Sequence, residues 1–132
     1  MISDIQFLLD TNVCIDFAKG KSMPLLERLE AQSSGTLGMS VISYAELSVG
    51  ARSAKPEDER QLAALAQIVR IIVFDNRAAE SYGRLIRQIG VQRRSFDRLI
   101  AAHALALGIT LITNNEADFA DIPGLKVENW TL

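Results

Sequence analysis

The stretch FLLDTNVCID, residues 7–16, places the strongest constraint on the fold. Its apolar residues Phe7–Leu9 run directly into Asp10, and a short unbroken apolar run is typical of a strand buried on both faces of a parallel sheet. Thr11 and Asn12 can cap a helix that follows it. Asp10 is therefore expected at the carboxyl end of a strand, where open α/β sheets bind ligands. The alternative, that Asp10 only caps the helix, remains open.

The rest of the chain alternates short apolar runs with helical patterns. Further strands are predicted at 36–42, 71–74, 109–113 and, as a short edge strand, 125–128. Helical segments separate these strands, so we expect a three-layer α/β/α sandwich with a central parallel sheet of four to five strands. At 132 residues, without a repeat or long linker, residues 1–132 are interpreted as a single domain.

Composition excludes several classes of protein. Fourteen basic and sixteen acidic residues give a net charge of −2, so the overall charge provides no argument for nucleic-acid binding. Cys14 is the only cysteine, which excludes an internal disulfide and is typical of a reducing compartment. We see no signal peptide and no apolar run of the ~20 residues that a membrane span needs. A cytoplasmic protein without a membrane partner is expected.

Acidic and amide side chains recur where apolar segments end or helices begin. The carboxyl ends of parallel strands meet at one edge of a sheet, so these side chains can converge there. The candidates are Asp10, Glu46, Asp97 and one or more of Asn115, Glu116 and Asp118. Gathered carboxylates repel one another unless a cation joins them. Oxygen ligands without a histidine or cysteine cluster select Mg²⁺, with Mn²⁺ also possible.

Such a site typically clamps a phosphate ester and activates a water for in-line attack. The sequence contains no Walker-type loop, nucleophile elbow or dinucleotide fingerprint, so metal-assisted phosphodiester hydrolysis is the sharpest hypothesis. Two of the polar residues also have purely structural interpretations. Ser43 and Glu46 have the spacing of a helix capping box. His103 lies among small apolar residues and is interpreted as a core histidine rather than a ligand.

Four segments together resemble the motifs of the PIN-domain ribonucleases. In chain order they are FLLDTNVCID, SYAELSVGA, FDRLIAAHALALG and LITNNEADFADIPGLKVENW. The resemblance covers the whole chain and is greatest to the VapC-type toxins of bacterial toxin–antitoxin pairs. It implies an Mg²⁺-dependent endoribonuclease that hydrolyses RNA phosphodiester bonds.

The resemblance also assigns roles to the acids. Asp10, Glu46 and Asp97 match the three acids of the family motifs, with Asp10 and Asp97 as the most direct metal ligands. Glu46 would hold a metal directly or through water and could orient the nucleophile. The fourth acidic position is expected at Asp118, with Asn115 as its polar neighbour, because Asn115 stands where many members carry an aspartate.

Pocket residues and a basic segment complete the expected site. Thr11, Asn12 and Thr113 match family residues that line the pocket through hydroxyl or amide groups. Residues 81–96 contain four arginines and no acid, and Arg98 follows shortly after. We expect Arg93, Arg94 and Arg98 to take RNA phosphates, although a solvated helix face is an open alternative.

The resemblance implies partners as well. A cognate antitoxin would lay a helix and an extended tail across an apolar groove near the pocket, and the toxin would form a homodimer and a larger assembly with the antitoxin. The alternative function is a catalytically inactive PIN-like module that binds RNA or protein. A phosphatase-like α/β domain is a distant third, because Asn12 stands where that class would need a second aspartate.

Overall fold

A computed structural model describes residues 4–52 and 55–132 of the chain. At its centre lies one sheet of five short strands, in the order β3-β2-β1-β4-β5, and every neighbouring pair is parallel. The strands are β1 (Phe7–Leu9), β2 (Leu37–Ser40), β3 (Arg70–Ile72), β4 (Thr110–Ile112) and β5 (Val127–Glu128). The predicted parallel sheet of four to five strands is confirmed.

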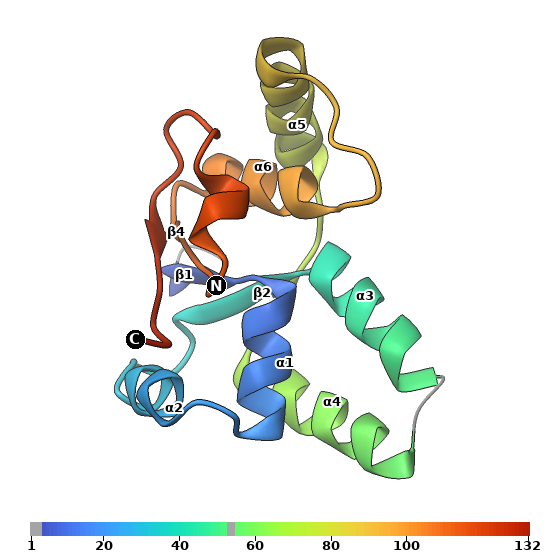
Figure 1. Ribbon diagram of the computed structural model, residues 1–132, viewed down its shortest axis with the longest axis vertical. Helices are drawn as coiled ribbons and strands as arrows, with labels where there is room; N and C mark the ends of the chain where they lie inside the picture. The colour runs from blue at the N-terminus through green and yellow to red at the C-terminus, as the bar shows by residue number, and fades with distance from the viewer. Residues whose placement is uncertain (1–3, 53–54) are drawn as a thin grey trace.

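Helices cover both faces of this sheet, as Figure 1 shows, and complete the predicted three-layer α/β/α sandwich. On one side lie α5 (Asn76–Ile89), α6 (Asp97–Leu107) and the short 3₁₀ helix η2 (Glu116–Phe119). On the other side lie α1 (Thr11–Lys19), α2 (Met23–Glu30) and α4 (Pro56–Ile68). The remaining helix, α3 (Val41–Arg52), contributes apolar residues to both cores.

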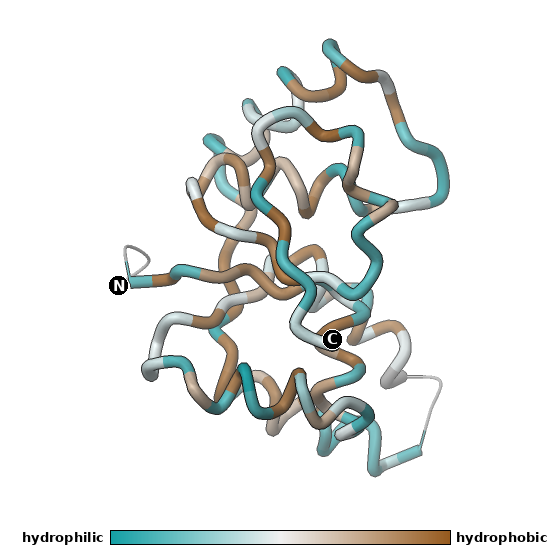
Figure 2. Tube along the Cα trace, turned by 60° about the vertical axis from the view of Figure 1, so that its left-hand side comes forward, coloured by the Kyte–Doolittle hydropathy of each residue, from teal (hydrophilic) through white to brown (hydrophobic). Residues whose placement is uncertain are grey.

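The two cores meet at β1, whose successive side chains point to opposite faces of the sheet. Leu8 belongs to the core under α5 and α6, and Leu9 belongs to the core under α1, α2 and α4. Both residues are fully buried, which explains why the sequence shows an unbroken apolar run rather than alternation. Figure 2 shows the same distribution, with apolar character concentrated on the central strands and mixed along the helices.

Local signals in the sequence set most helix boundaries. Asp10, Ser22 and Asp75 each accept a backbone N–H bond from the third residue on, and so cap α1, α2 and α5. Gly20 and Gly108 end α1 and α6 in the left-handed conformation, at φ 63° and 68°. These boundaries follow from residue type alone.

The junction between β2 and α3 differs from the prediction. Val41 and Ile42 were expected to extend the strand, but both lie in the first turn of α3. Ser40 Oγ accepts a hydrogen bond from the Ile42 backbone N–H at 3.1 Å, and this bond turns the chain two residues earlier than β-branched side chains suggest. Ser43 is therefore a buried residue inside the helix, and the capping-box hypothesis for Ser43 and Glu46 is wrong.

Gly38 lies in the middle of β2, although glycine weakens the interior of a strand. A Cβ atom at this position would lie 2.6 Å from Ile72 Cδ1 on the neighbouring strand. The Ile72 side chain occupies the space that a side chain at position 38 would need, so only glycine fits there without a shift of Ile72. Among the residues described, no helix is long and apolar enough to cross a membrane.

Candidate active site

Asp10 lies at the floor of the site, directly after β1. Its backbone N–H donates to the Ile112 carbonyl at 3.0 Å, which fixes it beside the end of β4. One carboxylate oxygen accepts from the Val13 N–H at 2.8 Å, and the other accepts from the Thr113 hydroxyl. Asp10 thus caps α1, as the alternative interpretation predicted, but the cap uses only one of its two carboxylate oxygens. The side chain is held in a single orientation by two strands and a helix.

The electrostatics of Asp10 show that other acids share its surroundings. Burial raises the pKa of Asp10 to about 6, against the bonds from Thr113 and Val13, which lower it. The negative charges of Asp97 and Asp16 raise the pKa further. A carboxylate held in this way is costly to ionise without a cation.

Asp97 lies at the first position of α6, as the sequence predicted. Its backbone N–H donates to Ser95 Oγ at 3.0 Å, while the helix itself begins after Phe96 without a side-chain cap. Burial raises the pKa of Asp97, the interaction with Ser95 lowers it, and the charge of Asp118 raises it. Asp10, Asp97 and Asp118 therefore form a connected series of mutually repelling carboxylates.

Glu46 reaches the site through Thr11. The Thr11 hydroxyl lies 2.7 Å from Glu46 Oε1 and 3.1 Å from Ser43 Oγ, and Thr11 is the residue after Asp10. The bond joins α3 to the start of α1, so it fixes the Glu46 carboxylate relative to Asp10. Asn12, which was also expected to line the pocket, is exposed in the first turn of α1.

Asn115 and Asp118 lie together on the exposed rim beyond β4. The Asn115 amide donates to an Asp118 oxygen, and the Asn115 backbone N–H donates to Thr113 Oγ1 at 3.0 Å. Thr113 is thus a shared partner, since its hydroxyl also donates to Asp10. The pairing favours the expectation that Asp118 supplies the charge and Asn115 positions it.

The sequence reasoning missed Asp16 and Asn114. The Asn114 amide donates to Asp16 Oδ2 at 2.7 Å and so ties α1 to the end of β4. The available signal was an acid in a helical segment whose neighbours Val13, Cys14 and Phe17 are apolar. The pairing could not be read from the sequence, because the two residues are 98 positions apart.

The three arginines expected to bind phosphate differ in their surroundings. Arg93 and Arg94 are exposed in the loop before α6, whereas Arg98 is engaged. The Arg98 guanidinium donates to the carbonyls of Ile89, at 3.2 Å, and Gly90, and it forms an ion pair with Asp121 at 2.8 Å. Arg98 therefore joins the end of α5 to the start of α6, and phosphate binding stays a prediction that falls mainly on Arg93 and Arg94.

His103 is a core residue, as expected. It is buried in α6, its Nδ1 lies 2.8 Å from Ser40 Oγ, and its ring meets Phe74 edge-on with centroids 5.2 Å apart. Burial lowers the pKa of His103, while the charge of Asp75 and a bond with the Val73 backbone raise it. The imidazole connects α6 with the ends of β2 and β3 rather than opening toward a ligand.

A magnesium ion fits this donor set in its chemistry. The side chains that converge on Asp10 offer carboxylate, amide and hydroxyl oxygens, which hard divalent cations prefer. Burial, and to a smaller extent neighbouring negative charges, raise the pKa of Asp10 and Asp97, so a bound cation would favour their ionised forms. Within the described ranges, no three His, Cys, Asp or Glu side chains are close enough to form a ready-made metal site.

Comparison with known proteins identifies the class. Residues 7–125 match the PIN domain family, and this span includes every acid of the site. The chain therefore belongs to the PIN-domain family, as the sequence motifs predicted.

Comparison with individual proteins gives a more specific result than the family match. The chain is 32% identical to the tRNA(fMet)-specific endonuclease VapC of Shigella flexneri, covering 96% of this chain and 99% of that protein. It is 34% identical to ribonuclease VapC2 of Rickettsia felis, over 94% and 97% of the two chains.

Solved structures give the same result. The crystal structure of VapBC2 from Rickettsia felis bound to a DNA fragment from their promoter matches with a TM-score of 0.83 at 31% identity, over 96% of this chain and 99% of that one. The structure of DNA-bound VapBC from Salmonella typhimurium matches with a TM-score of 0.82 at 31% identity, over 96% and 98%. The predicted resemblance to VapC-type proteins is confirmed.

Proposed function

We propose that this protein is an Mg²⁺-dependent endoribonuclease toxin whose activity a cognate antitoxin inhibits. The observation that carries the proposal is the buried carboxylate of Asp10, held at the end of β1 beside the negative charges of Asp97 and Asp16. A fold gains no stability from carboxylates that raise one another's pKa, so their presence argues for a function that needs them. The similarity to ribonucleases named VapC supplies the substrate class.

The residues of the site have distinct roles in this proposal. Asp10 and Asp97 would be the main residues that hold Mg²⁺, with Glu46 and Asp118 as further oxygen donors. The ion, when bound, neutralises charge on the scissile phosphate and lowers the pKa of a water for attack. Thr113 and Val13 orient the Asp10 carboxylate, and Thr11 orients Glu46.

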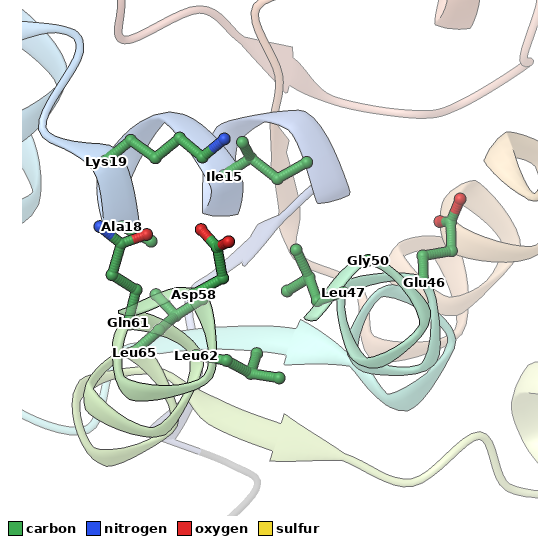
Figure 3. A pocket seen from close by; sticks show the side chains of 10 residues that line it. All are labelled: Ile15, Ala18, Lys19, Glu46, Leu47, Gly50, Asp58, Gln61, Leu62 and Leu65. Carbon is green, nitrogen blue, oxygen red and sulfur yellow. The ribbon is translucent and has the colours of Figure 1, made fainter. Parts of the chain in front are cut away.

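A pocket beside α3 is a candidate docking site for the antitoxin. The pocket lies between α1, α3 and α4, and apolar side chains from the three helices line it, including Ile15, Leu47 and Leu62. Figure 3 shows these side chains together with Lys19 and Asp58, while the Glu46 carboxylate on α3 points away from them. An antitoxin segment in this pocket would lie beside Glu46, which is one of its lining residues. The VapBC structures to which the chain is similar support such a partner.

Cleavage of RNA tests the proposal directly. We expect the purified protein, free of antitoxin, to cut RNA at discrete positions with Mg²⁺ and not with EDTA. The first substrate to try is tRNA(fMet), because relatives from Shigella and Salmonella are named for it. Elongator methionine tRNA and total RNA serve as comparisons. Action on cellular RNA would place the protein in the cytoplasm, and a homodimer is proposed as its free form.

Variants make the result specific. Asp97→Asn should lower the rate about 1000-fold, or about 4 kcal/mol in activation free energy, because it removes a ligand charge from the ion. Glu80→Gln, an exposed change of the same charge on α5, should leave the rate unchanged. Cleavage that survives Asp97→Asn would come from a contaminant. A folded wild-type protein that cuts no RNA with Mg²⁺ or Mn²⁺ would instead be an inactive binding module.

A further inference from the structure

The loop between α5 and α6 combines features that the proposed catalytic chemistry does not use. Figure 1 shows α5 extending away from the sheet and this loop returning from its end to the start of α6, where Asp97 lies. Four of its side chains are exposed, namely Val91, Arg93, Arg94 and Phe96. Phe96 is 51% exposed and immediately precedes Asp97. A single exposed apolar side chain needs no explanation, but an aromatic ring beside an acid of the site and two arginines does.

The loop is held in place at both ends. Arg98 donates to the carbonyls of Ile89 and Gly90 at its beginning, and the backbone N–H of Asp97 donates to Ser95 Oγ at its end. Between them, Arg94 adopts φ 62°, a left-handed conformation that costs energy in a residue other than glycine. The exposed side chains are therefore presented on a defined turn of backbone.

The charge of the loop is complementary to RNA. Residues 81–96 contain four arginines and no acid. In the described part of the chain, neither Arg93 nor Arg94 forms an ion pair. Adjacent Cα atoms are about 3.8 Å apart, so the Phe96 ring projects from the backbone position next to Asp97. A phosphate at the acids would place its neighbouring nucleotide within reach of this ring.

We propose that Phe96 is a stacking platform for an unpaired base next to the scissile phosphate, while Arg93 and Arg94 bind the flanking phosphates. Stacking on an aromatic side chain requires an exposed base face, which a paired and stacked nucleotide does not offer. The site would therefore select RNA at loops and other single-stranded positions. This inference rests on the proposed ribonuclease function and adds a requirement for the substrate.

A binding experiment without cleavage tests it. The probe is a short oligoadenylate that carries one 2-aminopurine, mixed with the wild-type protein in EDTA. We expect quenching of 2-aminopurine fluorescence in wild type and in Phe96→Tyr. With Phe96→Leu, which keeps an apolar side chain but has no aromatic face, we expect the quenching to vanish and binding to weaken about 10-fold. Val91→Ser, at another exposed apolar residue of the loop, is the matched control and should behave as wild type.

A second probe separates stacking from charge. An abasic ribose-phosphate chain of equal length should bind wild type and Phe96→Leu equally, since only phosphates remain. Equal quenching and affinity of wild type and Phe96→Leu for oligoadenylate, or no binding by wild type, would overturn the inference. So would a change from dimer to monomer in Phe96→Leu, measured by sedimentation, because Phe96 would then belong to a contact between copies.

Cleavage assays run in parallel distinguish this inference from the proposed function. If wild type cuts RNA with Mg²⁺ and Phe96→Leu cuts it equally well, the stacking role alone fails. If wild type does not cut, the ribonuclease proposal fails, whatever the binding result. Retained cutting of single-stranded RNA by Phe96→Tyr, with loss in Phe96→Leu, would support both.

Discussion

The two walls of the candidate site differ in chemistry. One wall, formed by α1, α3 and α4, is an apolar pocket that contains leucines and ends at Glu46. The opposite wall, formed by the loop from α5 into α6, carries exposed arginines and Phe96 and ends at Asp97. Asp10 is buried at the start of α1, and the negative charge of Asp97 at the end of this loop raises its pKa. An apolar surface suits a protein partner and a basic one suits RNA, so the difference assigns antitoxin and substrate to separate walls.

The largest effect is expected at Asp10, and it concerns the free energy of unfolding. Asp10 has a pKa of about 6 against its usual 3.8, so its ionised form is less favourable in the folded than in the unfolded state. Without a divalent cation, the free energy of unfolding should fall by about 3 kcal/mol as pH rises from 4 to above 6. Asp10→Asn should remove this loss and raise stability at pH 7.5, with little effect at pH 4.

Urea denaturation in EDTA at the two pH values measures this effect. Asparagine can still accept the Val13 N–H bond and contact Thr113, so the cap of α1 is preserved. Glu80→Gln serves as the control for a change of charge alone. Added Mg²⁺ should stabilise wild type at pH 7.5 more than Asp10→Asn. Equal stability of the two proteins at both pH values would show that Asp10 is not strained by ionisation.

The apolar wall can be tested through inhibition. Leu62→Glu places a charge in the pocket between α1, α3 and α4, and should weaken inhibition by the cognate antitoxin about 30-fold, or about 2 kcal/mol. Cleavage in the absence of antitoxin should remain, because Leu62 belongs to the wall away from the expected RNA path. Titration of antitoxin into a cleavage assay gives the affinity.

The matched control for this wall is Ile68→Glu, at an exposed apolar residue of the same helix that does not line the pocket. It should leave inhibition unchanged. If both variants weaken inhibition equally, the antitoxin covers the outer face of α4 rather than the pocket. If Leu62→Glu lowers cleavage itself while keeping its fold, the two walls do not have separate roles.

The basic wall has the smallest expected effect, about 1 kcal/mol per arginine at moderate salt. Removing both charges with Arg93→Gln and Arg94→Gln should lower the slope of log affinity against log salt by about 1.4, since each contact with single-stranded phosphate contributes about 0.7. Arg84→Gln with Arg87→Gln, on the exposed face of α5, tests whether the helix contributes. A larger change from the helix pair would move the RNA path away from the loop.

Most of the fold followed from local patterns. The apolar run before Asp10 predicted a strand buried on both faces, and Asp10 itself was one candidate for the cap of the helix that follows. These predictions succeeded because a cap depends on residues three positions apart. The start of α3 failed for a related reason. The β-branched Val41 and Ile42 favour a strand, but the hydroxyl of Ser40 turned the chain before them.

The sequence by itself determined which acids would follow a strand or lie near the start of a helix, and it therefore predicted that oxygen side chains would gather at one edge of a parallel sheet. Only the tertiary structure decided their partners. It bonded Thr113 to Asp10 and Thr11 to Glu46, brought Asp16 toward the site through Asn114, and engaged Arg98 with Asp121. Strand and cap propensities act over a few residues, whereas a side chain's hydrogen bonds and pKa depend on groups that folding brings from distant parts of the chain.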